Sequence, residues 1–121
     1  MDSSTNRNRN KKVWNRNKNL EPQSKRKKEG VFHVAAWYKV GVPESDVDRI
    51  NVDGTRHVLE TMRELGVPKG VYTSSLAVFS DTKGVVRDEH YRYDGPHLSR
   101  YDHSKWRAHY EVALPMMQAG L

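Results

Sequence analysis

Residues 31–38 read VFHVAAWY and open the part of the chain from which a fold can be inferred. A mostly apolar run of this length is typical of a β-strand buried on both faces of a parallel sheet. Residues 70–79, GVYTSSLAVF, form a second run with β-forming residues and small polar side chains. The two runs predict two strands of one sheet.

A helix is predicted after the first strand. Between residues 44 and 65, apolar residues and one glycine recur every three or four positions, as on one face of an amphipathic helix. The stripe consists of Val47, Ile50, Gly54, Val58, Met62 and Leu65. Gly66 and Pro68 are stop signals for this helix. Because glycine weakens a helix, we expect Gly54 to mark a close approach of the helix to the sheet.

A second helix is predicted from Tyr101 to Gln118, where apolar side chains again recur every three or four positions. Its apolar residues are Trp106, Tyr110, Ala113, Leu114 and Met117. Pro115 lies inside this pattern and should kink the helix or end its regular part early. The order strand, helix, strand, helix predicts an α/β fold with a parallel sheet.

Three residues are candidates for chemistry. Tyr101 and Lys105 are four residues apart, so a helix places both side chains on one face. Ser75 lies 26 residues upstream of Tyr101, at the carboxyl end of the second predicted strand. Ligands of open α/β sheets bind at that end. A Tyr-x-x-x-Lys pair alone arises often by chance, so its weight depends on the sequence around it.

Four motifs resemble the extended short-chain dehydrogenase/reductases, also called the NAD-dependent epimerase/dehydratase family. VFHVAA at residues 31–36 is similar to the V-x-H-x-A-A strand of that family, and NVDGT at residues 51–55 to its N-V-x-G-T helix motif. YTSSLAVF at residues 72–79 is similar to the S-S-x-x-V-Y-G segment, with Ser75 at the position of the catalytic Ser or Thr. YDHSK at residues 101–105 supplies the Tyr and the Lys. The motifs follow in the order of the family.

The resemblance implies an incomplete, doubly wound Rossmann-like domain over residues 31–121, and transfer of hydride at a carbonyl or secondary alcohol with NAD or NADP. Ser75, Tyr101 and Lys105 would be catalytic, and the cofactor would contact these three together with Ala35, Ala36 and Trp37. A lysine ammonium one turn from a tyrosine favours the phenolate, so Tyr101 would exchange a proton with the substrate. The substrate would be a nucleotide sugar or another small carbonyl or alcohol compound.

The sequence departs from this family in the cofactor loop. The family holds the pyrophosphate of the cofactor with a G-x-x-G-x-x-G turn at a helix N-terminus. No glycines with this spacing precede Val31. We therefore expect an internal piece of such an enzyme, which on its own has little or no activity and binds NAD or NADP poorly. The substrate and the choice between NAD and NADP stay open.

Residues 1–30 differ in composition from the rest. They contain ten Lys or Arg against three acidic residues, whereas residues 31–121 contain eleven against twelve. With few apolar residues to bury, this segment is predicted to be a disordered basic tail. The chain contains no run of apolar residues long enough for a signal peptide or a membrane span. It has no cysteine, which fits a reducing compartment, so we expect a cytoplasmic protein with no membrane partner.

Two function classes remain. The first is the NAD(P)-dependent enzyme, or a remnant of one. The alternative is a nucleic-acid-associated protein that uses the basic tail, in which Trp14 lies among Asn, Lys and Arg residues. We favour the enzyme and do not expect nucleic acid as a partner. We expect no metal site, because the histidines show no close ligand pair with a carboxylate. A homo-oligomer stays open.

Overall fold

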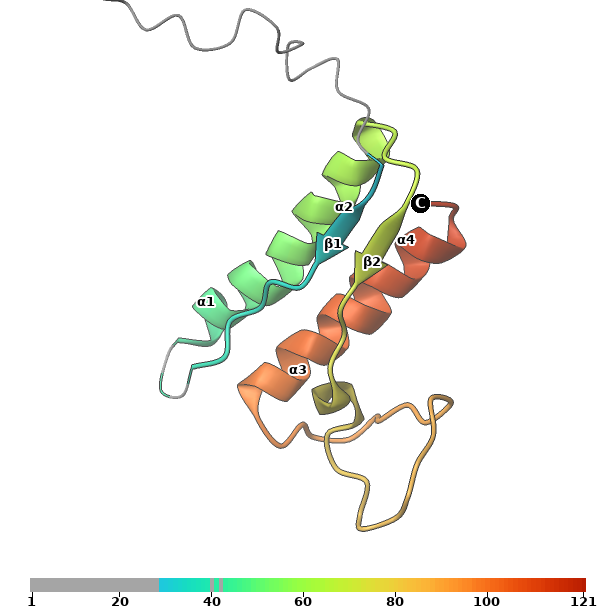
Figure 1. Ribbon diagram of the computed structural model, residues 1–121. Coiled ribbons are helices and arrows are strands. Elements are labelled where there is room, and N and C mark those ends of the chain that lie inside the picture. Colours follow the sequence, from blue (N-terminus) through green and yellow to red (C-terminus); the bar gives the residue numbers. More distant parts are fainter. Residues whose placement is uncertain (1–28, 40, 42) are drawn as a thin grey trace, which may run out of the picture.

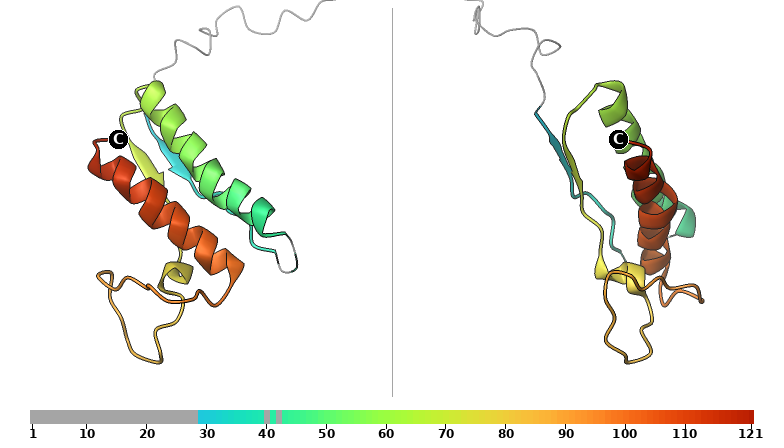
Figure 2. Two further views of the ribbon diagram at one scale, coloured as in Figure 1. Left: turned by 180° about the vertical axis from the view of Figure 1, so that it is seen from behind. Right: turned by 90° about the vertical axis from the view of Figure 1, so that its right-hand side faces the viewer.

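The computed structural model describes residues 29–39, 41 and 43–121. Strands β1 (Val31–His33) and β2 (Gly70–Tyr72) pair in parallel, with Val31 opposite Gly70. A long helix follows each strand (Figure 1), and Figure 2 shows that both helices cover the same face of the sheet. The fold is α/β with the predicted order of elements, and it corresponds to a partial Rossmann-like unit.

The first long helix combines α1 (Glu44–Asp48), the π-helical turn η2 (Arg49–Asp53) and α2 (Gly54–Glu64). Gly66 then takes a φ of 60°, a left-handed conformation that glycine adopts without steric cost, so the predicted stop signal is confirmed. The prediction of a close approach at Gly54 is wrong. The nearest atom to a side chain at that position would be the Arg49 carbonyl oxygen of the same helix, at 3.9 Å.

The buried face of this helix differs from the predicted stripe. Its buried side chains are Val47, Asn51, Val52, Thr55, Leu59 and Met62. Val58 is half-buried and packs against the core, as the stripe predicted, whereas Ile50 is only half-buried and Leu65 is exposed, so the prediction is wrong at Leu65. A π-helical turn contains more residues than an α-helical turn, so η2 rotates the residues around it to a new face.

The second long helix combines α3 (Arg100–Arg107), the π-helical segment η4 (Ala108–Ala113) and α4 (Leu114–Gln118). The predicted irregularity is found, upstream of Pro115 itself. Proline lacks an N–H group and its ring crowds the carbonyl four residues earlier, which here is Glu111 inside η4. The buried side chains are Ser104, Lys105, Ala108, Val112 and Ala113. Of the predicted apolar stripe, only Ala113 is fully buried, because the π-helical segment shifts the face.

The core lies between the two long helices and the sheet. It consists of Val52, Leu59, Met62, Val112 and Ala113, all buried. The end of the Met62 side chain occupies the space that a side chain on Gly70 would fill. This close packing explains why the second strand can begin with glycine.

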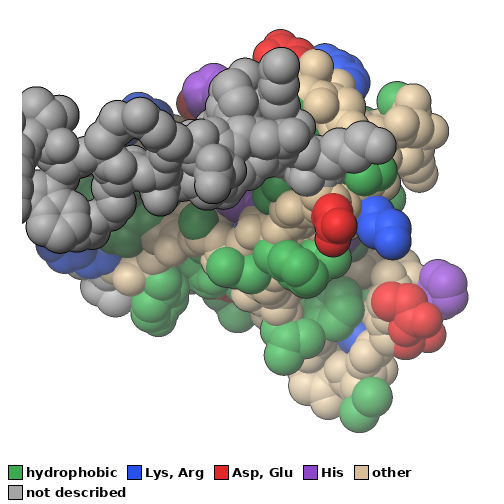
Figure 3. Space-filling view, turned by 45° about the horizontal axis from the view of Figure 1, so that its top comes forward, with side chains coloured by type: hydrophobic (Ala, Val, Ile, Leu, Met, Phe, Trp, Pro, Cys, Tyr) green, Lys and Arg blue, Asp and Glu red, His purple; other side chains and the backbone are tan. Residues whose placement is uncertain are grey.

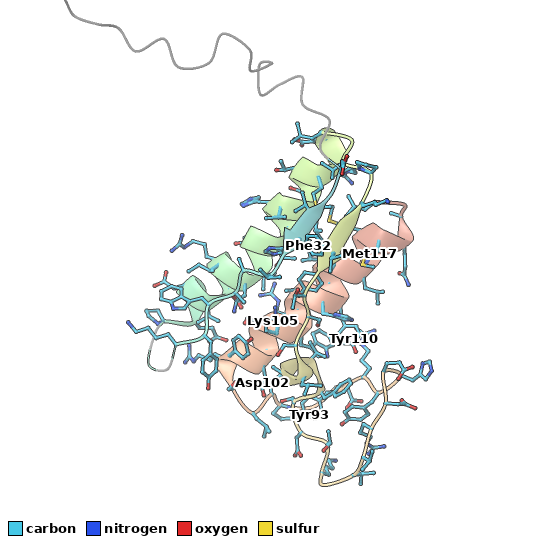
Figure 4. The ribbon with its side chains drawn as sticks, in the orientation of Figure 1. Phe32, Tyr93, Asp102, Lys105, Tyr110 and Met117 are labelled. Atoms are coloured by element: carbon cyan, nitrogen blue, oxygen red, sulfur yellow. The ribbon has the colours of Figure 1, made fainter. Side chains whose placement is uncertain are left out.

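The opposite face of the sheet is bare among the described residues. Phe32 and Val71 are cross-strand neighbours on this face and are 77% and 49% exposed. Phe32 points away from the helices (Figure 4), and hydrophobic side chains gather on the surface seen in Figure 3. The expectation that residues 31–38 form a strand buried on both faces is therefore wrong. The strand ends at His33, and one face of the sheet carries no helix layer.

Beyond β2 the chain runs through Thr73–Ser75 into the short 3₁₀-helix η3 (Leu76–Phe79). A loop over residues 80–99 follows, and it returns to the start of α3. Its ends are joined to that helix by hydrogen bonds of Ser80, whose Oγ accepts from the Leu98 N–H at 2.9 Å and donates to Asp102 Oδ2 at 3.3 Å. The loop is thus anchored next to Tyr101.

Replacing Phe32 with threonine should reduce self-association without loss of stability. Threonine keeps a high β-propensity, and the exposed phenyl ring contributes little to the core, so the free energy of unfolding should change by less than about 0.5 kcal/mol. Sedimentation velocity at several concentrations would measure association. Val86→Thr is the matched control, because Val86 is 97% exposed in the loop, away from the sheet. If both variants self-associate to the same extent as the parent chain, this face of the sheet does not mediate the self-association.

The predicted basic tail and the nucleic-acid alternative fall on residues 1–30, and residues 1–28 lie outside the described residues. Within the part of the chain that the structure describes, no helix is long and apolar enough to cross a lipid bilayer.

Candidate active site

The candidate site lies where the two strands end. Because β1 and β2 are parallel, the segments that follow them leave the sheet at the same edge. The segment after β1 carries Ala35, Ala36 and Trp37, and the segment after β2 carries Ser75. Helix α3 begins at this edge and packs against η3, which brings Tyr101 and Lys105 to it. The fold thus places the six predicted site residues around one end of the sheet.

Lys105 is the most deeply buried of these residues, with 3% of its surface exposed. Its Nζ atom donates a hydrogen bond to the Thr73 carbonyl oxygen at 3.2 Å and lies 5.3 Å from the centre of the Tyr72 ring. Burial lowers the pKa of Lys105 below its ordinary value. Among the described residues, the ammonium group has no carboxylate within salt-bridge distance. Figure 4 shows this side chain on α3, close to the segment that follows β2.

Tyr101 is half-buried, and its ring meets the Tyr38 ring edge to face, with 4.9 Å between centroids and 82° between planes. Tyr72 is a second tyrosine at the site. Burial, followed by the charge of an ionised Tyr101, raises the pKa of Tyr72 to about 12, and the neighbouring Ser74 hydroxyl acts in the opposite direction. Tyr72 therefore stays protonated at neutral pH and is a poor candidate for the base.

Ser75 caps the short helix η3. Its Oγ accepts a hydrogen bond from the Ala77 N–H at 3.1 Å, which leaves the hydroxyl proton for another acceptor. No hydrogen bond joins the side chains of Ser75, Tyr101 and Lys105 to one another in the described residues. Ala35 and Ala36 are exposed, whereas Trp37 is half-buried. The structure thus brings the predicted residues to one end of the sheet, and within the described residues no hydrogen bond connects the three catalytic candidates.

Asn51 connects three elements of the site and is 2% exposed. Its Oδ1 accepts from the Trp37 N–H at 2.7 Å, and its Nδ2 donates to the Trp37 carbonyl at 3.0 Å and to Ser104 Oγ at 2.9 Å. Ser104 in turn donates to the Tyr101 carbonyl at 2.8 Å. Asn51 thus holds the loop after β1 against the helix that carries Tyr101.

In the sequence, Asn51 is distinguished only as the first residue of the NVDGT motif. In the structure it lies inside the long helix, in η2, and contacts the loop after β1 from there. The signal that could have revealed its importance is a polar residue at helical spacing from Val47 and Thr55, both of which are buried. Ser104 was missed altogether. A serine one residue before the lysine of a Tyr-x-x-x-Lys pair gives no signal of burial by itself.

His33 extends this network to the end of β1. Thr55 Oγ1 donates to the Asn51 carbonyl at 2.8 Å, so its only proton is committed. The 3.0 Å contact between Thr55 Oγ1 and His33 Nε2 therefore has the histidine as donor. Burial, followed by the charge of Lys105, lowers the pKa of His33, which favours a neutral ring that is protonated on Nε2. This is the hydrogen-bonded core histidine that the strand pattern allowed.

Acid should destabilise the protein through His109. Burial, followed by the charge of Lys105, lowers the pKa of His109 below its ordinary 6.5. The folded chain therefore binds fewer protons than the unfolded chain as the pH falls through 6.5, and stability is lost until the pH drops below the folded-state pKa. Urea unfolding at about pH 7.5 and about pH 5.5 should show a smaller loss for His109→Gln than for the parent chain. A variant that loses as much stability as the parent would contradict this.

The described residues contain no group of three or more His, Cys, Asp or Glu side chains that could hold a metal ion. His97 and His103 stack with 4.8 Å between ring centroids and 24° between ring planes.

Comparisons with known proteins show which family the chain resembles. Residues 15–114 match the 3-beta hydroxysteroid dehydrogenase/isomerase family. D-erythronate dehydrogenase of Cupriavidus necator is 45% identical over 64 residues, which cover 49% of this chain and 19% of that protein. The putative dihydroflavonol 4-reductase of Synechocystis is 37% identical over 95 residues, 76% of this chain and 27% of that protein. An undecaprenol-linked N-acetylglucosaminyl 4-epimerase of Escherichia coli O157:H7 is 39% identical over 81 residues, 64% and 23% of the two chains.

No solved structure matches significantly. The matched regions span only 19 to 27% of the lengths of these relatives. The family match begins at residue 15, inside the segment predicted as a tail, so the domain boundary at residue 31 stays a prediction. Members of the family depend on NAD or NADP and act on small molecules. The chain belongs to the 3-beta hydroxysteroid dehydrogenase/isomerase family, within the extended short-chain dehydrogenase/reductases that its motifs resemble.

Proposed function

We propose that residues 31–121 carry the proton-transfer part of an NAD(P)-dependent reductase, dehydrogenase or epimerase site that acts on a carbonyl or secondary alcohol. Tyr101 is the acid or base, Lys105 supplies the neighbouring positive charge, and Ser75 donates to the substrate oxygen. The observation that carries this proposal is the burial of Lys105, without a carboxylate partner in the described part of the chain, one helical turn from Tyr101 and at the carboxyl ends of two parallel strands.

The placement of Lys105 matters because a buried ammonium group without a carboxylate is unfavourable. Such a charge acts strongly on its surroundings, since little water screens it. It lies beside Tyr72 and Thr73, at the strand ends where α3 also begins. At this end of the sheet, the Tyr101 hydroxyl is the group that takes the proton of an alcohol or returns one to a carbonyl oxygen.

The chain's residues fit a nicotinamide dinucleotide at its ribose end. The Lys105 ammonium has three N–H groups, and the structure shows one of them on Thr73, which leaves two for ribose hydroxyls. Ala35 and Ala36 are exposed and small, so a ligand can approach the backbone there. The Trp37 N–H is engaged by Asn51, so a cofactor would contact Trp37 through its side chain or its carbonyl oxygen, which can accept a second hydrogen bond. The bound cofactor would supply or accept the hydride.

The proposal is tested by grafting residues 31–121 into a complete relative. D-erythronate dehydrogenase of Cupriavidus necator is suitable, because its name defines an assay with D-erythronate. We expect the graft to reduce NAD with D-erythronate, measured by nicotinamide absorbance, at a rate well above that of the same graft carrying Lys105→Met. Lys105→Met keeps the shape of the side chain and removes the charge. A folded graft that is inactive, or equal rates for the two proteins, would show that this site does not perform the reaction.

A further inference from the structure

A cavity of about 230 Å³ lies beside Tyr101. Its walls include Trp37, Tyr38, Val47 and Tyr101, and two cationic side chains, Lys39 and Arg100, also line it. Cavities that hold a whole drug-sized ligand typically measure about 300–1,000 Å³. This cavity is therefore large enough for one part of a ligand, and it contains the proposed acid or base in its wall.

Trp37 and Tyr38 form the aromatic wall of the cavity and are accessible to a ligand that enters it. Tyr38 is 72% exposed, yet its ring meets the Tyr101 ring edge to face. The loop that carries Tyr38 is held in place through Trp37, whose backbone N–H and carbonyl both bond to the buried Asn51. An apolar or planar group that entered the cavity would cover Trp37 and Tyr38 and lie in the same cavity as Tyr101.

The charge at the cavity favours an anion. Lys39 takes part in no salt bridge among the described residues. Arg100 Nη1 pairs with Glu44 Oε2 at 3.0 Å, but both side chains are more than half exposed. Such a surface pair contributes little, so a carboxylate or phosphate on a ligand can compete with Glu44 for Arg100. The two cations lie on different elements, Lys39 on the loop after β1 and Arg100 at the first residue of α3.

We propose that this cavity binds the substrate, and that the substrate combines an apolar or planar body with an anionic group. The body lies against Trp37 and Tyr38, and the carboxylate or phosphate is held by Lys39 and Arg100. This arrangement presents the alcohol or carbonyl to Tyr101. The inference deepens the proposed function and rests on the assignment of Tyr101 as the acid or base.

The experiment uses the full 121-residue chain labelled with ¹⁵N. Its three tryptophans give three indole N–H signals, which single Trp→Phe variants assign. The probes are 2-naphthoate, 2-naphthyl phosphate and the neutral 2-naphthalenemethanol. We expect each probe to shift the Trp37 signal saturably and to leave that of Trp106 unchanged. The anions should bind about two- to fivefold more tightly than the alcohol, as expected for contact with exposed cations. The comparison of carboxylate with phosphate identifies the preferred anion.

Variants of the lining residues separate the contribution of the aromatic wall to binding from that of the two cations. Lys39→Gln and Arg100→Gln should each reduce the preference for the anions, and the double variant should remove it. Tyr38→Ser should weaken all three probes equally, whereas Tyr38→Phe should bind like the parent chain. Arg63→Gln is the matched control, because Arg63 is an exposed cation at the far end of α2. Absence of a saturable Trp37 shift, or an anion preference that survives in the double variant, would overturn the proposal.

These outcomes are independent of the test of the proposed function, because the probes need neither cofactor nor hydride transfer. An inactive graft together with saturable binding at Trp37 would remove the catalytic assignment and leave the anion subsite. An active graft without binding at Trp37 would leave Tyr101 as the acid or base and place the substrate elsewhere.

Discussion

Replacing Tyr101 with phenylalanine in the active graft of residues 31–121 should lower turnover about 10²–10⁴-fold. The substitution removes the only proton that the side chain can exchange and keeps the ring, which packs edge to face against Tyr38. Binding of substrate should change little, since the ring contacts remain. Steady-state kinetics with D-erythronate and NAD would separate the two effects, with the loss in kcat and a nearly constant KM.

Tyr110→Phe is the matched control for this prediction. Tyr110 lies on the same long helix, in η4, and its hydroxyl makes a long hydrogen bond of 3.4 Å to the Tyr91 carbonyl. The Tyr110→Phe variant loses a phenol oxygen, as Tyr101→Phe does, from a different position on the same long helix. We expect its turnover to stay close to that of the parent graft. Near-normal turnover of the Tyr101→Phe variant would mean that Tyr101 is not the acid or base and that the Tyr-x-x-x-Lys pair has a structural role only.

Replacing Asn51 with leucine should lower the free energy of unfolding by about 3 kcal/mol. The substitution removes three hydrogen bonds and leaves the Trp37 N–H, the Trp37 carbonyl and the Ser104 hydroxyl without this partner. Leucine has a similar size, so the effect measures lost polar contacts more than lost volume. Urea unfolding of the 121-residue chain gives the change in stability from the midpoint at constant slope.

Asp53→Leu serves as the comparison for this variant, because Asp53 ends the same π-helical turn and is exposed. It should change the free energy of unfolding by less than about 0.5 kcal/mol. In the Asn51 variant, the Trp37 indole signal should also shift, because the loop after β1 is no longer held. A loss below about 1 kcal/mol with an unmoved Trp37 signal would show that the network is dispensable.

The sequence predicted the existence of the helices and strands better than it predicted their boundaries and the buried faces of the helices. The two helices and two strands all occur, because apolar spacing and the stop signal at Gly66 are local properties of the chain. The buried faces were misjudged in both helices. The first long helix contains the π-helical segment η2, and the second contains η4. In a π-helix each N–H bonds to the carbonyl five residues earlier, so the buried face shifts relative to a regular α-helix. A regular helical period in the sequence does not show where such a segment occurs.

For the candidate site, too, some features follow from the sequence and others only from the tertiary structure. The sequence by itself determined the family, the α/β order and the candidates Ser75, Tyr101 and Lys105, because these depend on residue types at fixed spacings along single elements. Only the tertiary structure decided which groups meet across elements. Lys105 is buried against Thr73, which lies on another element, and Asn51 ties the loop after β1 to the helix of Tyr101. Such contacts join residues far apart in the chain, so no local pattern records them, and they depend on how the helices pack on one face of the sheet.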